Sequence, residues 1–151
     1  MVDRFEQFTA SISSIYRYIQ KIERDEMEKY GLKGAFAQYL LAMTHYSEGI
    51  TAAALCEVCD KDKAAVSRIL SEMESKGLIR RKDSDSSYRA ILTLTDSGKE
   101  AAAFVSNRAT AAVELAGKGL SAPDRKIFYA TLDLIATNLQ AICQEGIPET
   151  L

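Results

Sequence analysis

The chain has 151 residues, of which 47% are hydrophobic and 26% are charged, with a formal net charge of −2 and a pI near 5.5. This composition is that of a folded globular protein and excludes a disordered chain. No apolar run approaches the roughly 18 residues of a membrane span, the N-terminus lacks the blocks of a secretory signal, and three cysteines do not make a disulfide framework. We therefore expect one domain, residues 1–151, in the cytoplasm and with no membrane partner.

A long helix is predicted from residue 5 to about residue 29. Large apolar side chains recur along it at alternating intervals of three and four residues, which is typical of a seam between two helices: Phe5, Phe8, Ile12, Ile15, Ile19 and Ile22. Tyr16 and Tyr18 lie beside this seam, and Gly31 is a helix stop. Because a seam so near the terminus has little of its own domain to cover, we expect it to pair with a second copy of the chain.

Two shorter helices are expected next. The first covers about residues 34–46 and has an apolar face made of Phe36, Tyr39, Leu40 and Met43. Thr51 can cap the second, residues 52–58, whose inward positions are Leu55, Cys56 and Cys59.

The segment from Asp60 to Lys82 is the most informative part of the chain. Asp60 and Asp62 can cap a helix that ends at Gly77. One face of this helix is apolar, with Val66, Ile69, Leu70 and Met73, and the opposite face carries donors suited to DNA: Lys61, Lys63, Ser67, Arg68 and Ser71. Two helices joined by a short turn, the second carrying donors, indicate a helix-turn-helix.

Charge is distributed unevenly along the chain. Residues 61–89 contain eight basic and five acidic side chains, a net charge of +3, whereas the remainder has 11 basic and 16 acidic ones, a net charge of −5. Positive charge therefore gathers around the proposed recognition helix, although a merely solvated helix face is the alternative interpretation.

A wing and two further helices complete the expected order of elements. Strands at Leu78 to Lys82 and Tyr88 to Leu94 enclose a polar turn, residues 83–87. A helix follows from Lys99 to about Gly117, and Ser121 can cap a last helix. That last helix has its own seam: Phe128, Leu132, Ile135, Leu139 and Ile142. We expect the seams at the two ends of the chain to pack together across a two-fold axis.

These segments together resemble the MarR family of winged-helix transcriptional regulators. The resemblance rests on residues 66–81, VSRILSEMESKGLIRR, with the family's Gly-Leu-Ile-x-Arg, on the Leu-Thr-x-x-Gly run at 94–98, and on Gly31-Leu32 before the second helix. It implies a mainly α fold with a small β-wing, in which a winged helix-turn-helix, about 34–95, is flanked by dimerisation helices at about 4–30 and 97–146.

The resemblance also implies a function and the residues that carry it. The expected protein is a homodimeric, sequence-specific repressor that binds double-stranded DNA at a pseudo-palindromic operator. The recognition helix would face bases with Lys63, Ala64, Ala65, Ser67 and Arg68. The DNA backbone would be held by Thr51, Lys61, Ser71, Arg80, Arg81 and Lys82.

Two of these assignments have alternatives, and the wing departs from the family pattern at one position. Arg68 can pair with Glu72, one helical turn away, instead of reading guanine. Arg81 can brace the wing by pairing Asp83 or Asp85. The family's wing usually carries arginine where this chain has Ser87, so Arg89 is the candidate replacement.

Family members commonly bind a small aromatic or anionic effector between the dimerisation helices and the winged helix. The resemblance implies a comparable pocket, with candidate lining residues Tyr16, Ile19, Phe36, Tyr39 and Met43. For each of these side chains the alternative is an ordinary place in the core.

Other classes of function have less support. Cys56 and Cys59 form a C-x-x-C pair, but a structural zinc wants four ligands and the only histidine, His45, is in another helix, so no metal or cofactor is expected. Thiol-based redox sensing through these cysteines or Cys143 remains an alternative, as does a winged-helix adaptor between proteins. No Gly-rich phosphate loop, no histidine–acid pair near a nucleophile and no paired carboxylates indicate an enzyme.

Overall fold

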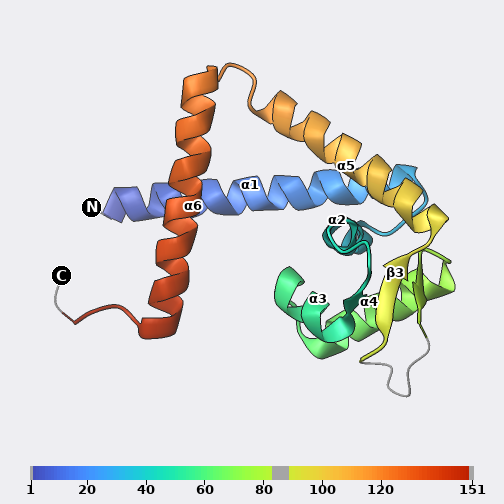
Figure 1. The fold of residues 1–151 in the computed structure, drawn as a ribbon. Helices are drawn as coiled ribbons and strands as arrows, with labels where there is room; N and C mark the ends of the chain where they lie inside the picture. Colours follow the sequence, from blue (N-terminus) through green and yellow to red (C-terminus); the bar gives the residue numbers. More distant parts are fainter. Residues whose placement is uncertain (1, 83–88, 150–151) are drawn as a thin grey trace. The chain divides into compact units, whose positions relative to one another are not determined.

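The structure is a computed structural model that describes residues 2–82 and 89–149. Helices make up most of it, and one three-stranded antiparallel sheet completes it, which is the mainly α class with a small sheet that the sequence predicts (Figure 1). The chain divides into two compact units, Met1–Ala111 and Ala112–Leu151, and each is described by itself. Within the described residues, no helix is both long enough and apolar enough to cross a membrane.

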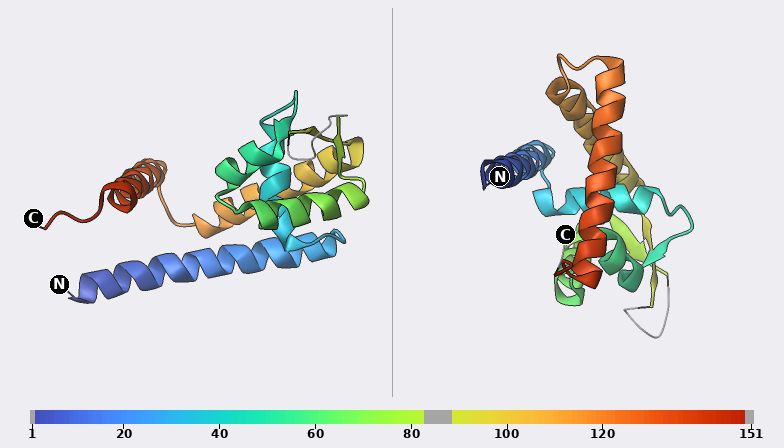
Figure 2. Two further views of the ribbon diagram at one scale, coloured as in Figure 1. Left: turned by 90° about the horizontal axis from the view of Figure 1, so that it is seen from below. Right: turned by 90° about the vertical axis from the view of Figure 1, so that its left-hand side faces the viewer.

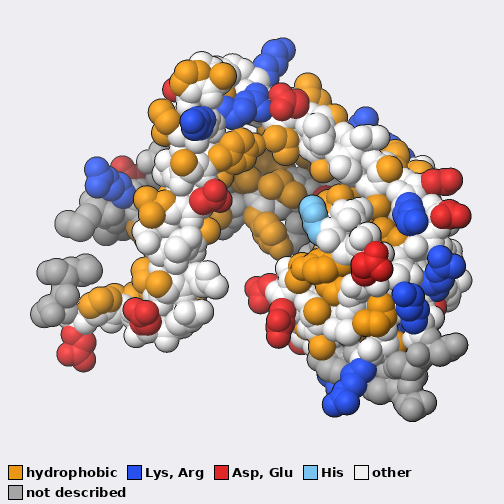
Figure 3. All heavy atoms as spheres, viewed as in Figure 1, with side chains coloured by type: hydrophobic (Ala, Val, Ile, Leu, Met, Phe, Trp, Pro, Cys, Tyr) orange, Lys and Arg blue, Asp and Glu red, His pale blue; other side chains and the backbone are white. Residues whose placement is uncertain are grey.

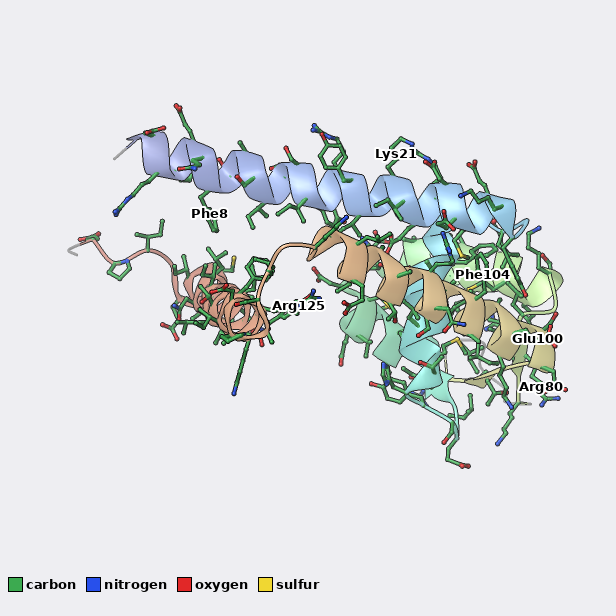
Figure 4. The ribbon with its side chains drawn as sticks, turned by 90° about the horizontal axis from the view of Figure 1, so that it is seen from above. Phe8, Lys21, Arg80, Glu100, Phe104 and Arg125 are labelled. Carbon is green, nitrogen blue, oxygen red and sulfur yellow. The ribbon has the colours of Figure 1, made fainter. Side chains whose placement is uncertain are left out.

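The N-terminal helix α1, Val2–Lys29, is continuous, as predicted. Its seam side chains are exposed, whereas Met27, near its C-terminal end, is buried in the core of the first unit. Phe8 and Lys21 lie on opposite sides of α1 in Figure 4, so the apolar seam and the charged side of the helix are distinct.

The helix predicted at 34–46 is divided in two. A 3-10 turn, η1, covers Gly34–Phe36, and α2 covers Ala37–Thr44. At Gly34 an added Cβ would lie 2.7 Å from the Cα of Arg24, so only glycine lets η1 approach α1 this closely.

The helix-turn-helix consists of α3, Ala52–Cys59, and α4, Lys63–Ser75. Thr51 caps α3 and Asp62 caps α4, as predicted. The prediction that Asp60 also caps the second helix is wrong, because Asp60 is the C-terminal cap of α3, with a left-handed φ of 50°. A short polar side chain tolerates that conformation, and it turns the chain between the two helices.

A small sheet has the strand order β1-β3-β2; β1 precedes the helix-turn-helix, and β2 and β3 follow it (Figure 1). Strand β2, Ile79–Arg81, pairs with β3, Ile91–Leu94, so that Ile79 is opposite Leu94. The predicted second strand began at Tyr88, but Arg89 and Ala90 precede the strand, and the rest of that start, with the predicted turn, lies outside the described residues. Strand β1, Ile50–Thr51, was not predicted.

One hydrophobic core unites the first unit. It takes Met27 from α1, most of the apolar side chains of η1, α2 and the sheet, and three residues of α4: Val66, Leu70 and Met73. The first turns of α5, Asp96–Ala116, close this core with Ala101, Ala102 and Val105.

The second unit contains the end of α5 and the helix α6, Ala122–Glu145. Ser121 caps α6 by accepting a hydrogen bond from the Asp124 amide at 3.2 Å, as predicted. Arg125 donates to the Gly117 carbonyl at 3.3 Å and pairs with Glu114 at 3.3 Å, which holds the turn between the helices. Among the described residues of this unit none is buried, and Figure 3 shows hydrophobic side chains along α6 interspersed with polar and charged ones.

Candidate nucleic-acid interface

Helix α4 is fixed from one side and open on the other. Val66, Leu70 and Met73 are completely buried, so the core sets the rotation of the helix about its axis. At its N-terminus the Asp62 carboxylate accepts a hydrogen bond from the Ala65 amide at 2.8 Å, which caps the first turn. A helix held in this way presents its opposite face, and its N-terminal half, without freedom to rotate.

The residues predicted to contact DNA from the helix-turn-helix lie on that opposite face. The exposed ones are Lys61, Lys63, Ala64, Ser67, Arg68 and Ser71, and Ala65 and Thr51 are half-buried. Lys and Arg side chains are visible over the winged-helix part in Figure 3. The structure therefore brings this set together on one surface, while its contact with DNA stays a prediction.

Two hydroxyl groups of this set already have partners. Ser71 donates to the Ser67 carbonyl at 3.0 Å, and the Thr51 hydroxyl accepts from the Ala54 amide at 3.2 Å. Thr51 still has a proton to donate, whereas Ser71 must leave its helical carbonyl before it can donate to a phosphate.

The alternative pairing of Arg68 with Glu72 is absent from the described part of the chain. Glu72 instead pairs with Lys33, which directly precedes η1. Arg68 is exposed and makes no ion pair with any described residue. Its guanidinium is thus available to an external acceptor.

The basic residues of the wing differ from one another in their surroundings. Arg80, Lys82 and Arg89 are exposed, but Arg81 is only 21% exposed in its side chain and pairs with Glu74 of α4 at 2.8 Å. This ion pair joins β2 to the C-terminal end of α4. The partners considered from the sequence, Asp83 and Asp85, and also Ser87, lie outside the described residues.

The candidate effector residues fall into two groups. Phe36, Tyr39 and Met43 are buried in the core, whereas Tyr16 and Ile19 are exposed on α1. A shallow open pocket lies elsewhere, where α5 turns into α6, and none of the five candidates lines it. Binding of an effector by these five residues stays a prediction.

Both cysteines of the C-x-x-C pair lie on α3. Cys56 and Cys59 are half-buried against the core, less inward than predicted. Burial, and to a smaller degree the neighbouring Cys56, raise the pKa of the Cys59 thiol. A thiol with a raised pKa is a poor nucleophile at neutral pH, which weighs against redox sensing at this position. In the described residues no group of three potential metal ligands is present.

Lys33 is the residue near this surface that the sequence gives no reason to select. It is 39 residues from Glu72 along the chain, and only the packing of η1 against α4 brings the two side chains together. A local spacing pattern cannot reveal such a pair.

Comparison with known proteins gives the context of this fold. A family model described as "MarR family" matches residues 30–90. Among curated proteins the sequence has no match. Three solved structures share the fold over nearly the whole chain. A MarR transcriptional regulator from Methanosarcina mazei Go1 is 22% identical, with a TM-score of 0.80, over 91% of this chain and 92% of that one.

Two further similar structures contain DNA. A Listeria monocytogenes protein assigned to the MarR family, complexed with a 26-mer DNA, is 19% identical, with a TM-score of 0.78, and covers 95% of this chain and 97% of its own. The S. aureus MepR–DNA complex is 18% identical, with a TM-score of 0.76, over 87% and 96%. The family model covers the helix-turn-helix described above, and the structures agree with the fold of the flanking helices. Residues 30–90 therefore match the MarR family model, and the chain has the winged helix-turn-helix fold of these solved structures.

Proposed function

We propose that this protein is a homodimeric repressor that binds double-stranded DNA at a pseudo-palindromic operator. The observation that carries the proposal is the exposed donor face of α4, which is held rigidly by the three buried residues Val66, Leu70 and Met73. A recognition helix of this kind reads bases from its N-terminal half. The net charge of +3 over residues 61–89 supports an approach to phosphate despite the acidic whole.

Two exposed apolar seams support the dimer. Along α1 the exposed fractions are 69% for Phe5, 39% for Phe8, 41% for Ile12, 50% for Ile15, 47% for Ile19 and 46% for Ile22. On α6, Phe128, Leu139 and Ile142 are 43%, 48% and 40% exposed, and the other two seam residues, Leu132 and Ile135, are half-buried. Long apolar stripes of this kind mark interaction surfaces, and a second copy offers the same stripes in return.

The dimer would place two α4 helices about one helical turn of DNA apart, roughly 34 Å, in successive major grooves. A small aromatic or anionic effector would release the DNA if it bound one spacing of these helices more tightly than the other. Such an effector acts only through that difference in affinity.

Arg68 provides the sharpest test of sequence reading. Arginine bound bidentately to guanine contributes about 1–3 kcal/mol of discrimination, roughly 5- to 150-fold. We expect Arg68→Ala to weaken binding to a fragment from upstream of the protein's own coding region by this factor, and binding to shuffled DNA far less. Fluorescence anisotropy at several salt concentrations measures both affinities.

Lys76→Ala is the matched control, because it removes one exposed positive charge at the end of the same helix. It should lower both affinities slightly and equally. Equal losses for Arg68→Ala on both DNAs would mean that Arg68 touches only the backbone. A wild-type protein that binds neither DNA at about 50 mM salt would favour the alternative function, an adaptor between proteins.

A further inference from the structure

Arg68 has a potential competitor for DNA within its own helix. Glu72 is four residues further along α4, so the two side chains lie one helical turn apart on neighbouring positions of the surface. An unpaired carboxylate there would attract the guanidinium and hold it against the helix. It would also repel the DNA backbone.

Lys33 occupies that carboxylate instead. Its Nζ lies 2.5 Å from Glu72 Oε2, and the two side chains are 60% and 33% exposed. The position of Lys33 is set by η1, whose first hydrogen bond runs from the Phe36 amide to the Lys33 carbonyl at 3.0 Å. Since η1 packs against α4, the ammonium group is delivered to Glu72 from a different element.

We propose that Lys33 is a specificity-determining residue: by binding Glu72, it keeps the Arg68 guanidinium available to read a base. The inference rests on the proposed function, because it presupposes that Arg68 reads DNA. Lys33 itself touches no base in this account. Lys33 prevents Glu72 from competing with the DNA for Arg68. Its loss should therefore weaken binding to the cognate DNA, in which Arg68 contacts a base, more than binding to shuffled DNA.

The size of the effect follows from the strength of exposed ion pairs. Such pairs are worth about 0.2–1 kcal/mol, which corresponds to roughly a 1.4- to 5-fold change in an equilibrium. Loss of Lys33 should therefore weaken cognate binding by about 1.4- to 5-fold. Binding to shuffled DNA, which depends on phosphate contacts, should change only as it does for Lys76→Ala.

Three variants measured against both DNAs separate this mechanism from simpler ones. Lys33→Ala should lose cognate affinity, and Lys33→Ala/Glu72→Gln should regain it, because glutamine no longer captures Arg68. Glu72→Gln alone should match or exceed the wild type. If Glu72→Gln loses as much as Lys33→Ala, the ion pair acts by positioning α4. If the double variant is not rescued, Lys33 contacts phosphate itself, and either result overturns the proposal.

A measurement without DNA keeps the inference independent of the proposed function. In ¹⁵N-labelled protein, the Arg68 Nε–H resonance should shift in Lys33→Ala and return in Lys33→Ala/Glu72→Gln. An unchanged resonance in Lys33→Ala means that Glu72 does not capture Arg68, and this overturns the inference. If the wild type fails to distinguish cognate from shuffled DNA while the resonance shifts as expected, the proposed function fails and the capture of Arg68 by Glu72 stands.

Discussion

Thr95 and Gly98 show, atom by atom, how two turns of the winged helix are fastened together. The Thr95 hydroxyl donates to the Gly77 carbonyl at 2.5 Å and accepts from the Gly98 amide at 3.0 Å. The Thr95 amide donates to the Leu78 carbonyl at 3.0 Å. The two sequence signatures, Gly-Leu-Ile-x-Arg and Leu-Thr-x-x-Gly, are therefore two sides of one junction between the end of α4 and the start of α5.

Gly98 is required at this junction by space. A Cβ added to it would lie 1.9 Å from the Leu78 carbonyl oxygen, a backbone atom that cannot move aside without disturbing β2. We expect Gly98→Ala to lower the free energy of unfolding by about 1–3 kcal/mol. The sign is diagnostic, because alanine in a helix otherwise stabilises by roughly 0.5–1 kcal/mol relative to glycine. Urea unfolding followed by circular dichroism measures the difference.

Ser97→Ala, at the exposed neighbouring position, controls for a change of side chain in the same turn and should leave stability nearly unaltered. A Gly98→Ala variant as stable as the wild type would mean that α5 and β2 separate at no cost, contrary to the tight contact described here.

At the scale of elements, the C-terminal end of α1 is docked on α5 within the first unit. Arg108 pairs with Glu26 at 2.6 Å, and the rings of Tyr30 and Phe104 stack with their centroids 4.5 Å apart. Figure 4 labels Phe104 on α5 close to that end of α1, and Figure 2 shows the ribbons of both helices from two further sides. The helix that carries the exposed apolar seam is thereby joined to the element that closes the core.

Glu26 makes this docking dependent on pH. Hydrogen bonds from Lys29 and then from Arg108 lower the pKa of its carboxyl below the ordinary value of 4.5. Because the folded state holds the charged form more tightly, the contribution to stability is present above pH 4.5 and is lost as the pH falls through the lowered pKa. We expect Glu26→Gln to be less stable than the wild type at pH 7, and the difference to shrink towards pH 3.

The urea midpoint of each protein across this pH range is the measurement. Glu28→Gln, two residues along the same helix, is the matched control, because Glu28 makes no ion pair within the described part of the chain. If the difference in urea midpoint between the wild type and Glu26→Gln stays constant with pH, the shape of the Glu26 side chain rather than its charge is responsible for the loss of stability.

The sequence predicts most elements because their signals are local. Periodic apolar side chains reveal α1, α4 and α6, and the caps Thr51, Asp62 and Ser121 lie within three residues of the amides they bind. Strand β1 was missed because two residues carry no alternating pattern and exist as a strand only by pairing with β3. Asp60 was misassigned because a left-handed helix cap and an N-terminal cap favour the same short polar side chain.

The sequence likewise predicts only the local features of the candidate site. The exposed face of α4 follows from the spacing of its buried residues. Its ion pair to Lys33 does not, since Lys33 and Glu72 are 39 residues apart in the chain. The local spacing favours a pair between Arg68 and Glu72, but Glu72 pairs with Lys33, which only tertiary packing brings near it.

At the scale of the whole molecule, the proposed function makes the seams on α1 and α6 responsible for bringing two α4 helices together on one operator. Each half-site contributes only part of the binding free energy, and linking two recognition helices in one dimer converts the second contact into an intramolecular event. A monomer with an intact α4 would therefore bind one half-site weakly and gain nothing from the second. Dimerisation and operator affinity should be lost together.

Ile15→Glu tests this coupling. Ile15 lies on the α1 seam and is 50% exposed in the single chain, and a charge buried there in a dimer interface would cost several kcal/mol. We expect the wild type to have twice the 16.6 kDa mass of the chain by light scattering, and Ile15→Glu to shift towards 16.6 kDa. Affinity for the full operator should fall steeply, while affinity for an isolated half-site stays unchanged.

Ser13→Glu is the matched control, because it adds the same charge at an exposed position off the seam, and it should remain a dimer with wild-type binding. An Ile15→Glu protein that keeps the dimer mass would place the interface elsewhere, and one that becomes monomeric yet retains operator affinity would show that the two recognition helices do not act together.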